Sequence, residues 1–291
     1  NKVLKSRVDE CAPFENVYTL ALRGLHDRAM NASNNMSDRK EMLQEALMAQ
    51  RQMLVDAIGK RAEDIPQAFT PYKEVLDVYD QGLELPDDVT IIWPDDNYGY
   101  MKRLSSPKEQ KRSGRSGVYY HSSYLGKPHD HLWMNTTSPT LMYEELRKAY
   151  DLTGDRICLL NAGDIKSCEF AVDYFLTMAF DIDSFNFERA ANYRTEWLCG
   201  MLGNDYRNEY QDVINSFYKL AFARKPEFMG WGYQWATDKH GRERNTDTDF
   251  SLANYREVDT RLAEYRRIGN VAERILKALP EDKKALFIPV F

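Results

Sequence analysis

The chain has 291 residues, of which 43% are hydrophobic and 29% charged, and its formal net charge is −6. This length allows one large domain or two smaller ones, and the negative charge argues against nucleic acid as the main partner, because phosphate binding needs a basic face. No segment approaches the roughly 20 apolar residues of a membrane span, so we expect no membrane partner.

The first third of the chain predicts strands that alternate with helices. Residues 16–23 (NVYTLALR) are typical of a strand that leads into the polar loop around Asp27. Apolar residues then recur at helical spacing from Ser37, a suitable N-cap, to Ile58. A weaker strand at 65–70 and a short helix at 75–79 follow.

Three apolar runs in the middle of the chain each lead directly into a polar cluster. They are VTIIWPDDN at 89–97, GVYYHSSY at 117–124 and ICLLNAGD at 157–164. Parallel strands buried on both faces have such unbroken apolar sequences, and barrel enzymes carry their reactive residues at the carboxyl ends of the strands. We therefore expect Cys158, in the third run, to lie in the core. Helices are predicted at 138–150 and 168–180.

About five strands alternating with helices predict an α/β fold with a parallel sheet. A complete barrel of this type needs eight strands and roughly 250 residues, so either the sheet is open and doubly wound or further strands precede Asn1. The missing initiator methionine favours the second interpretation.

The pattern changes after residue 187. Segments 188–222 and 247–279 have helical spacing, whereas 237–249 is typical of a loop. We predict a partial barrel over 1–186 and an α-helical bundle domain over 187–291. Apolar and aromatic residues at helical spacing are expected to form the bundle core: Trp197, Tyr206, Tyr210, Phe217, Tyr218, Leu252, Tyr255, Leu262, Tyr265 and Ile268.

Two carboxylates are candidates for acid–base chemistry. Glu74 follows a strand and a Pro-Tyr turn, from which it could project into a pocket as a general acid or base. The alternative is a first-turn glutamate that the helix dipole stabilises. Asp27 is either a second catalytic carboxylate or a cap.

Further polar residues stand at the predicted strand ends. Adjacent Asp95 and Asp96 repel each other, so they need a cation, a sugar or a hydrogen-bond network, unless they only form a turn. His121 is flanked by tyrosines and followed by Lys127, which suits an anionic or hydroxylated ligand. Asn161 carries an amide where a buried strand favours an apolar residue, which indicates hydrogen bonding to a ligand.

Long ordered motifs resemble glycoside hydrolase family 115, the xylan α-glucuronidases. These motifs are TPYKEVLDVYDQGLELPDDVTIIWPDDNYGYMKRL, GRSGVYYHSSYLGKPHDHLW and LLNAGDIK, within a similarity that covers most of residues 16–235. The resemblance implies a (β/α)8 barrel, preceded by another domain and followed by a helical bundle and a C-terminal β domain. It also implies a secreted or periplasmic protein, and a homodimer formed through regions outside this chain.

The family removes α-1,2-linked glucuronic acid, or its 4-O-methyl form, from xylan with inversion. The resemblance places Glu74 at the catalytic acid, and Arg23 and Asp27 in an Arg-Gly-x-x-Asp loop. It matches four residues to the lining of the uronate pocket: Asn97, His121, Tyr124 and Asn161. The catalytic base stays open between Asp27, Asp95, Asp96 and a carboxylate upstream.

Two rival functions remain. A metal-dependent barrel enzyme could use Asp95, Asp96, His121 and Asp164 as ligands. A non-catalytic sugar-binding module would keep the pocket but need no acid at Glu74. The four cysteines have no zinc-site spacing, and the glucuronidase hypothesis expects no metal and no cofactor.

Overall fold

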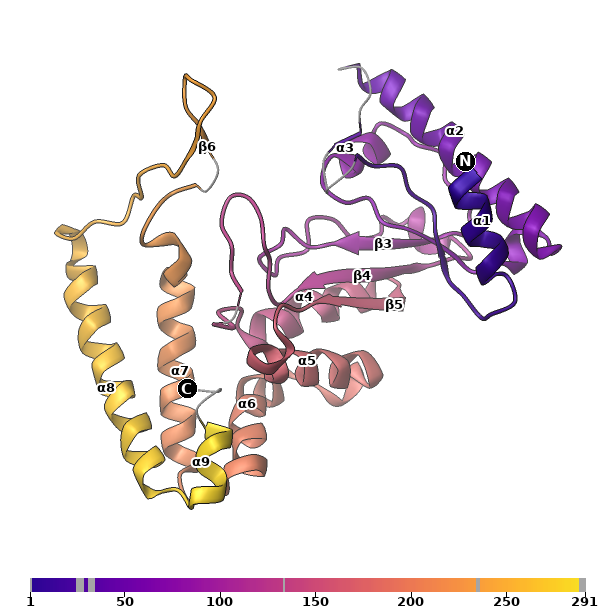
Figure 1. Ribbon diagram of the computed structural model, residues 1–291. Coiled ribbons are helices and arrows are strands. Elements are labelled where there is room, and N and C mark those ends of the chain that lie inside the picture. The colour runs from indigo at the N-terminus through magenta and orange to yellow at the C-terminus, as the bar shows by residue number, and fades with distance from the viewer. Residues whose placement is uncertain (1, 25–28, 31–34, 133, 234–235, 288–291) are drawn as a thin grey trace. The chain divides into compact units, whose positions relative to one another are not determined.

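The computed structural model describes residues 2–24, 29–30, 35–132, 134–233 and 236–287 (Figure 1). The chain divides into two compact units. The first unit consists of Asn1–Asp96, Met101–Tyr119 and Lys148–Leu159, and the second of Asn97–Tyr100, Tyr120–Arg147 and Leu160–Phe291. The predicted division into 1–186 and 187–291 stays a prediction.

Five strands form one sheet in the order β1-β2-β3-β4-β5, and the sheet curls into a parallel half-barrel. The strands are β1 (Tyr18–Thr19), β2 (Gln67–Phe69), β3 (Thr90–Pro94), β4 (Ser116–His121) and β5 (Gly154–Asn161). The connecting segments contain α2 (Met36–Ile58), α3 (Glu74–Asp80) and α4 (Pro139–Asp151), and α5 (Ile165–Phe180) follows β5. The predicted α/β fold with a parallel sheet is therefore confirmed, and the half-barrel is consistent with part of a TIM-type barrel.

Helix α2 ends as the sequence predicts but begins at a different cap. Gly59 has φ 72° and its N–H bonds Val55 O, which closes the helix in the left-handed conformation that glycine tolerates. At the other end Asn35, not Ser37, is the N-cap, because its side chain accepts a hydrogen bond from the Ser37 N–H.

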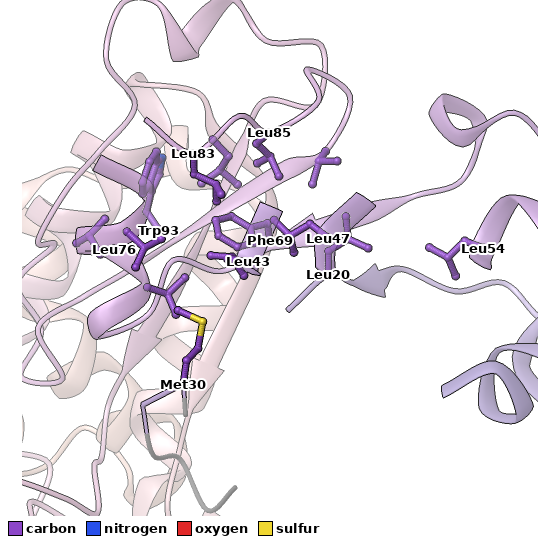
Figure 2. Close-up of a cluster of buried hydrophobic side chains, with 14 of the residues drawn as sticks. Leu20, Met30, Leu43, Leu47, Leu54, Phe69, Leu76, Leu83, Leu85 and Trp93 are labelled. Atoms are coloured by element: carbon purple, nitrogen blue, oxygen red, sulfur yellow. The ribbon is translucent and has the colours of Figure 1, made fainter. Parts of the chain in front are cut away.

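The core of the first unit lies between α2, α3 and the sheet (Figure 2). Leu43, Leu47 and Leu54 come from one face of α2, and Phe69 and Trp93 come from β2 and β3. Trp93 is fully buried and its indole N–H donates to Ser105 Oγ at 2.9 Å, so its one polar atom is satisfied.

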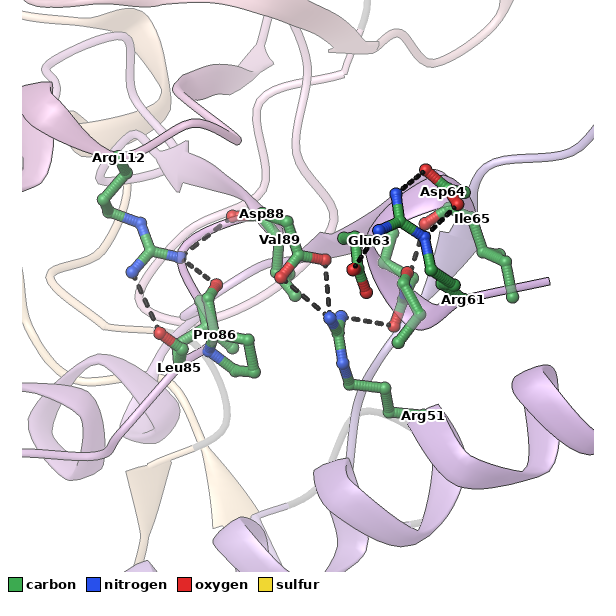
Figure 3. A network of polar contacts seen from close by, with 12 residues as sticks. Arg51, Arg61, Glu63, Asp64, Ile65, Leu85, Pro86, Asp88, Val89 and Arg112 are labelled. Atoms are coloured by element: carbon green, nitrogen blue, oxygen red, sulfur yellow. Dashed lines mark hydrogen bonds and ion pairs between the residues drawn. The ribbon is translucent and has the colours of Figure 1, made fainter.

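Arg51, which is buried, and Arg112, which is partly buried, bond residues at the amino ends of the strands (Figure 3). Arg51 donates to Gln67 Oε1 at 3.1 Å, at the start of β2, and to Asp88 Oδ1 at 2.8 Å, just before β3. Arg112 donates to three backbone carbonyls, of Leu85, Pro86 and Val89. This end of the sheet is occupied by structural hydrogen bonds, which matches the stabilising role of the amino-terminal face in barrel proteins.

Helices dominate the second unit after α5. They are α6 (Phe187–Leu202), α7 (Arg207–Ala223), α8 (Glu257–Ala278) and α9 (Glu281–Phe287), and their apolar faces share one buried cluster. Tyr210 and Tyr218 lie in this cluster and Ile268 is also buried, as predicted. In the first unit, α1 (Lys2–Cys11) contacts α2. Short 3-10 turns lie at Ala62–Asp64, Glu109–Lys111, Ile182–Ser184, Pro226–Phe228 and Asn254–Arg256.

Part of the predicted helical core was wrong. Leu252 and Tyr255 are 81% and 95% exposed, because α8 begins only at Glu257. Tyr255 and Arg256 have φ of 59° and 50°, a left-handed pair that interrupts any helix before that point. Leu262 is also exposed. The loop predicted at 237–249 contains a short hairpin of β6 (Ala236–Thr237) and β7 (Glu243–Arg244).

Strand β5 differs from the prediction of a fully buried strand. Cys158 is exposed rather than in the core, and Leu159 is 43% exposed. The reason is position, since β5 is the last strand in the sheet order and an apolar run does not reveal whether its strand lies at an edge. Within the described ranges, no helix combines the length and hydropathy needed to cross a bilayer.

Candidate active site

The first unit contains a bidentate ion pair between Arg23 and Glu74. Arg23 Nε donates to Glu74 Oε1 at 3.1 Å and Arg23 Nη2 donates to Glu74 Oε2 at 3.0 Å. Both side chains are 19% exposed, so the pair is sheltered but reachable. Parallel N–H···O bonds of this kind fix the orientation of both groups. The pair holds the carboxylate of α3 beside the segment that follows β1.

An aromatic side chain supports this pair. The Arg23 guanidinium and the Lys73 ammonium lie 5.4 and 5.0 Å from the centre of the Tyr72 ring, and Tyr119 meets that ring edge-on at 5.7 Å. Cations attracted to an aromatic face keep positive charge next to Glu74. Lys73 has φ 54°, a conformation that is costly for a lysine and that is often found at functional sites.

The loop after β3 places Asn97 in the second unit. Asn97 adopts φ 73°, which asparagine tolerates, and its carbonyl O lies 2.6 Å from His131 Nε2. Two residues later, Gly99 has φ 98° and its carbonyl accepts the Tyr120 hydroxyl at 3.0 Å. A Cβ at Gly99 would stand 2.7 Å from that hydroxyl oxygen, so glycine is required there.

His121 and Tyr124 stand at the end of β4, both buried. Their rings meet edge-to-face, with centres 5.7 Å apart. The backbone of Tyr124 exchanges two hydrogen bonds with His131, at 2.7 and 2.9 Å, which closes the loop 124–131. The ring of Tyr98 packs against both Tyr124 and His131, and its hydroxyl donates to His129 O at 2.6 Å.

Asn161 ends β5 and lies beside the end of β4. Its carbonyl O accepts the Ser122 N–H at 3.0 Å, the Ser122 hydroxyl at 3.1 Å and the Ser123 N–H at 3.3 Å. The backbone of Asn161 is therefore bonded to Ser122, the residue that directly follows His121.

In the second unit, His131 contacts both Asn97 and Tyr124, and Tyr124 contacts His121. Asn161 bonds Ser122 and Ser123, the two residues that follow His121. Arg23 and Glu74 form their own pair in the first unit, and Asp27 lies outside the described residues. Sequence reasoning did not single out Tyr98, His129 or His131. Their signal was present, because all three belong to the quoted motifs.

The residues that a metal-dependent enzyme would use as ligands do not form a metal site in the described part of the chain. Asp164 is exposed and is the N-cap residue of α5, while Asp95 is 1% exposed. Among the residues that the structure describes, no three side chains of His, Cys, Asp or Glu are placed to hold a metal ion together.

The half-barrel, with polar residues following its strands, has the layout of a TIM-type barrel enzyme. Residues 1–228 match the family model of glycosyl hydrolase family 115, and the chain belongs to this family.

A solved GH115 4-O-methyl-α-glucuronidase with specificity for decorated arabinogalactans is similar to the chain, with a TM-score of 0.89 and 37% identity. The match covers 98% of this chain and 37% of that one, so the chain spans little more than a third of this relative's length. No curated protein matches this chain.

Proposed function

We propose that the protein is a glycoside hydrolase that releases α-1,2-linked glucuronic acid, or its 4-O-methyl form, from glucuronoxylan by inversion. The observation that carries the proposal is the sheltered Arg23–Glu74 pair, in a chain whose family is shown. A uronic acid presents a carboxylate, and a guanidinium is the side chain that binds a carboxylate with two parallel hydrogen bonds. Glu74 is the proposed acid that protonates the leaving oxygen.

The pairing suggests how substrate binding prepares Glu74. In this structure both oxygens of the Glu74 carboxylate accept N–H groups of Arg23. An entering uronate competes for Arg23, and transfer of Arg23 to the substrate leaves Glu74 partly buried without this partner. Glu74 can then turn to the leaving oxygen, as the proposed acid must.

The second group of residues is proposed to bind the sugar. Tyr124 supplies a hydroxyl, His121 an imidazole and Asn97 an amide, which together can satisfy the hydroxyl groups of a uronate ring. Asn161 completes the set. Inversion needs a base that activates a water, with the two carboxyl groups roughly 6.5 to 9.5 Å apart. Asp27, Asp95 and Asp96 are the candidates in this chain.

The remaining proposals concern the whole protein. We propose that residues 187–291 form a helical bundle domain that follows the barrel in the sequence, supported by the cluster that α6 to α9 share. A secreted or periplasmic location agrees with a polysaccharide substrate, which is too large to enter a cell intact. The homodimer that the resemblance implies stays a proposal.

The variant Glu74→Gln tests the assignment of the acid. In the full-length protein we expect kcat on glucuronoxylan to fall at least about 100-fold, since general acid catalysis contributes typically 10² to 10⁴, while the melting temperature stays near that of the wild type. Glu84→Gln, an exposed residue of the same unit, is the matched control. Full activity of Glu74→Gln would rule out its role.

Further assays test which polymer is the substrate and whether either rival function applies. Assays on glucuronoxylan and on uronate-decorated arabinogalactan decide between the two substrates, the second being favoured by the solved relative. Loss of activity on chelation would support a metal enzyme. Binding without turnover in the full-length wild type would support a sugar-binding module.

A further inference from the structure

A groove in the second unit lies apart from the uronate-binding residues. Its volume is about 670 Å³, within the range of roughly 300 to 1,000 Å³ that is typical of ligand sites. Its lining comes from the loop after β3, the start of α4, and helices α6 and α7. Buried Ile214 and Tyr218 belong to this lining, and Tyr218 is fixed by a hydrogen bond from Arg194 to its hydroxyl at 2.7 Å. We call this feature the α6–α7 groove.

Exposed aromatic rings contribute to the lining of the α6–α7 groove. Phe187 is 59% exposed and Phe222 is 81% exposed, and both line the hollow. Phe187 is held in place by the ring of Tyr143, edge-on at 5.2 Å. Tyr100 contributes a third partly exposed ring. Large exposed apolar side chains around a concave surface indicate a binding site.

The charge of the lining points to an uncharged ligand. Among the described residues of the lining, Glu144 carries the acidic and Lys219 the basic side chain, and their charges cancel. Ser138, Thr140 and Asn215 add hydroxyl and amide groups to the lining. A uronate needs net positive charge, which this groove lacks. A neutral sugar chain, with apolar ring faces and hydroxyl edges, matches both kinds of lining.

The groove is continuous in sequence with the candidate active site. Tyr100 stands three residues after Asn97 in the same loop, and Ser138 opens α4 in the segment that also carries His121 and Tyr124. We propose that the α6–α7 groove binds the neutral main chain of the polysaccharide from which the uronate is removed. This inference rests on the proposed function and adds the site that recognises the rest of the substrate.

The test replaces an exposed wall residue in the full-length protein. Phe222→Ala removes one ring without opening a cavity, and Phe180→Ala is the matched control, because Phe180 is 93% exposed and does not line the groove. We expect Phe222→Ala to lower kcat/KM on the decorated polymer about 3- to 10-fold through KM. Cleavage of a uronic acid linked to a single sugar should not change. Equal losses on both substrates, or no loss on either, would overturn the proposal.

Calorimetry with uronate-free oligosaccharides separates this proposal from the proposed function. Xylo-oligosaccharides and galacto-oligosaccharides form the two arms and distinguish the source of the main chain. Binding by the wild type and the Phe180 variant, weakened in Phe222→Ala, supports the groove even if no uronate is released. Absence of binding in both arms, or a lower melting temperature of Phe222→Ala that indicates a protein segment packed there, contradicts it.

Discussion

At the scale of single residues, the candidate site depends on an arginine that meets a carboxylate 51 positions away. Glu74 begins α3, where the helix dipole favours an acid, and Arg23 also holds its carboxylate in a sheltered position. The role of Glu74 as the acid stays a proposal. Substitution of Arg23 tests whether this pair takes part in binding the uronate.

Arg23→Lys should lower kcat/KM on a uronic acid substrate about 10- to 100-fold, because a lysine cannot form two parallel hydrogen bonds to one carboxylate. Steady-state kinetics on the full-length protein measure this change. Arg115→Lys is the matched control, since Arg115 makes a comparable bidentate pair with Asp155 at 2.7 and 2.5 Å just before β4. If both variants lose activity equally, Arg23 has no special part in binding the uronate.

At the scale of elements, the loop between β3 and β4 is fixed by a charged cluster. Glu109 accepts two hydrogen bonds from Arg103, one from the Ser106 N–H at 2.7 Å and one from the Tyr79 hydroxyl at 2.8 Å. The Arg103 guanidinium also lies 4.4 Å from the centre of the Trp93 ring. Long polar loops are usually mobile, and this cluster ties the polar stretch 102–115 to the core.

Glu109→Gln should destabilise the protein in a pH-dependent way. Burial alone would raise the pKa of Glu109, but donors from Arg103 and Ser106 outweigh it and lower the pKa below its usual value. A lowered folded-state pKa stabilises the fold above the unfolded-state pKa, and this contribution is lost as the pH falls through the folded-state value. We expect a loss of about 1–3 kcal/mol at pH 7 that shrinks below about pH 4. Urea unfolding from pH 7 to 3 measures it, with exposed Glu15→Gln as the control; a difference that does not vary with pH would refute the argument.

At the scale of the whole molecule, each unit has its own apolar cluster. Leucines of α2 pack against Phe69 and Trp93 in the first unit, whereas Ile275 of α8 lies among residues of α6 and α7 in the second. Ile275 is fully buried. Stability of the helices after residue 187 therefore depends on packing between helices that are far apart in the sequence. Leu198 and Ile275, for example, belong to the same cluster and are 77 positions apart.

Ile275→Ala should lower the free energy of unfolding by about 2–5 kcal/mol, as expected for removing a buried isoleucine side chain. Leu262→Ala, on the same helix but 47% exposed, should cost much less. Hydrogen exchange localises the effect, and we expect faster exchange in α6 to α9 while α2 and β3 stay protected. Faster exchange in β3 to the same degree would show that the two clusters unfold together.

Local patterns were sufficient for much of the fold. The helical spacing from Ser37 to Ile58 predicted α2 almost to the residue, because caps and periodicity are encoded by neighbouring residues. The run VTIIWP predicted β3, whose residues from Ile91 to Pro94 are all buried. The same reasoning failed for Cys158 and Leu159, since an apolar run is compatible with an edge strand as well as a central one.

By itself, the sequence determined that strands alternate with helices, that polar residues follow three apolar runs, and that motifs of family 115 are present. Only the tertiary structure decided which of these residues touch. It paired Arg23 with Glu74 and placed His131 against the carbonyl of Asn97. It also brought the start of α4 together with α6 and α7 around the α6–α7 groove. The physical reason is that spacing along the chain fixes which face of an element a side chain occupies, whereas contacts between elements depend on how those faces pack.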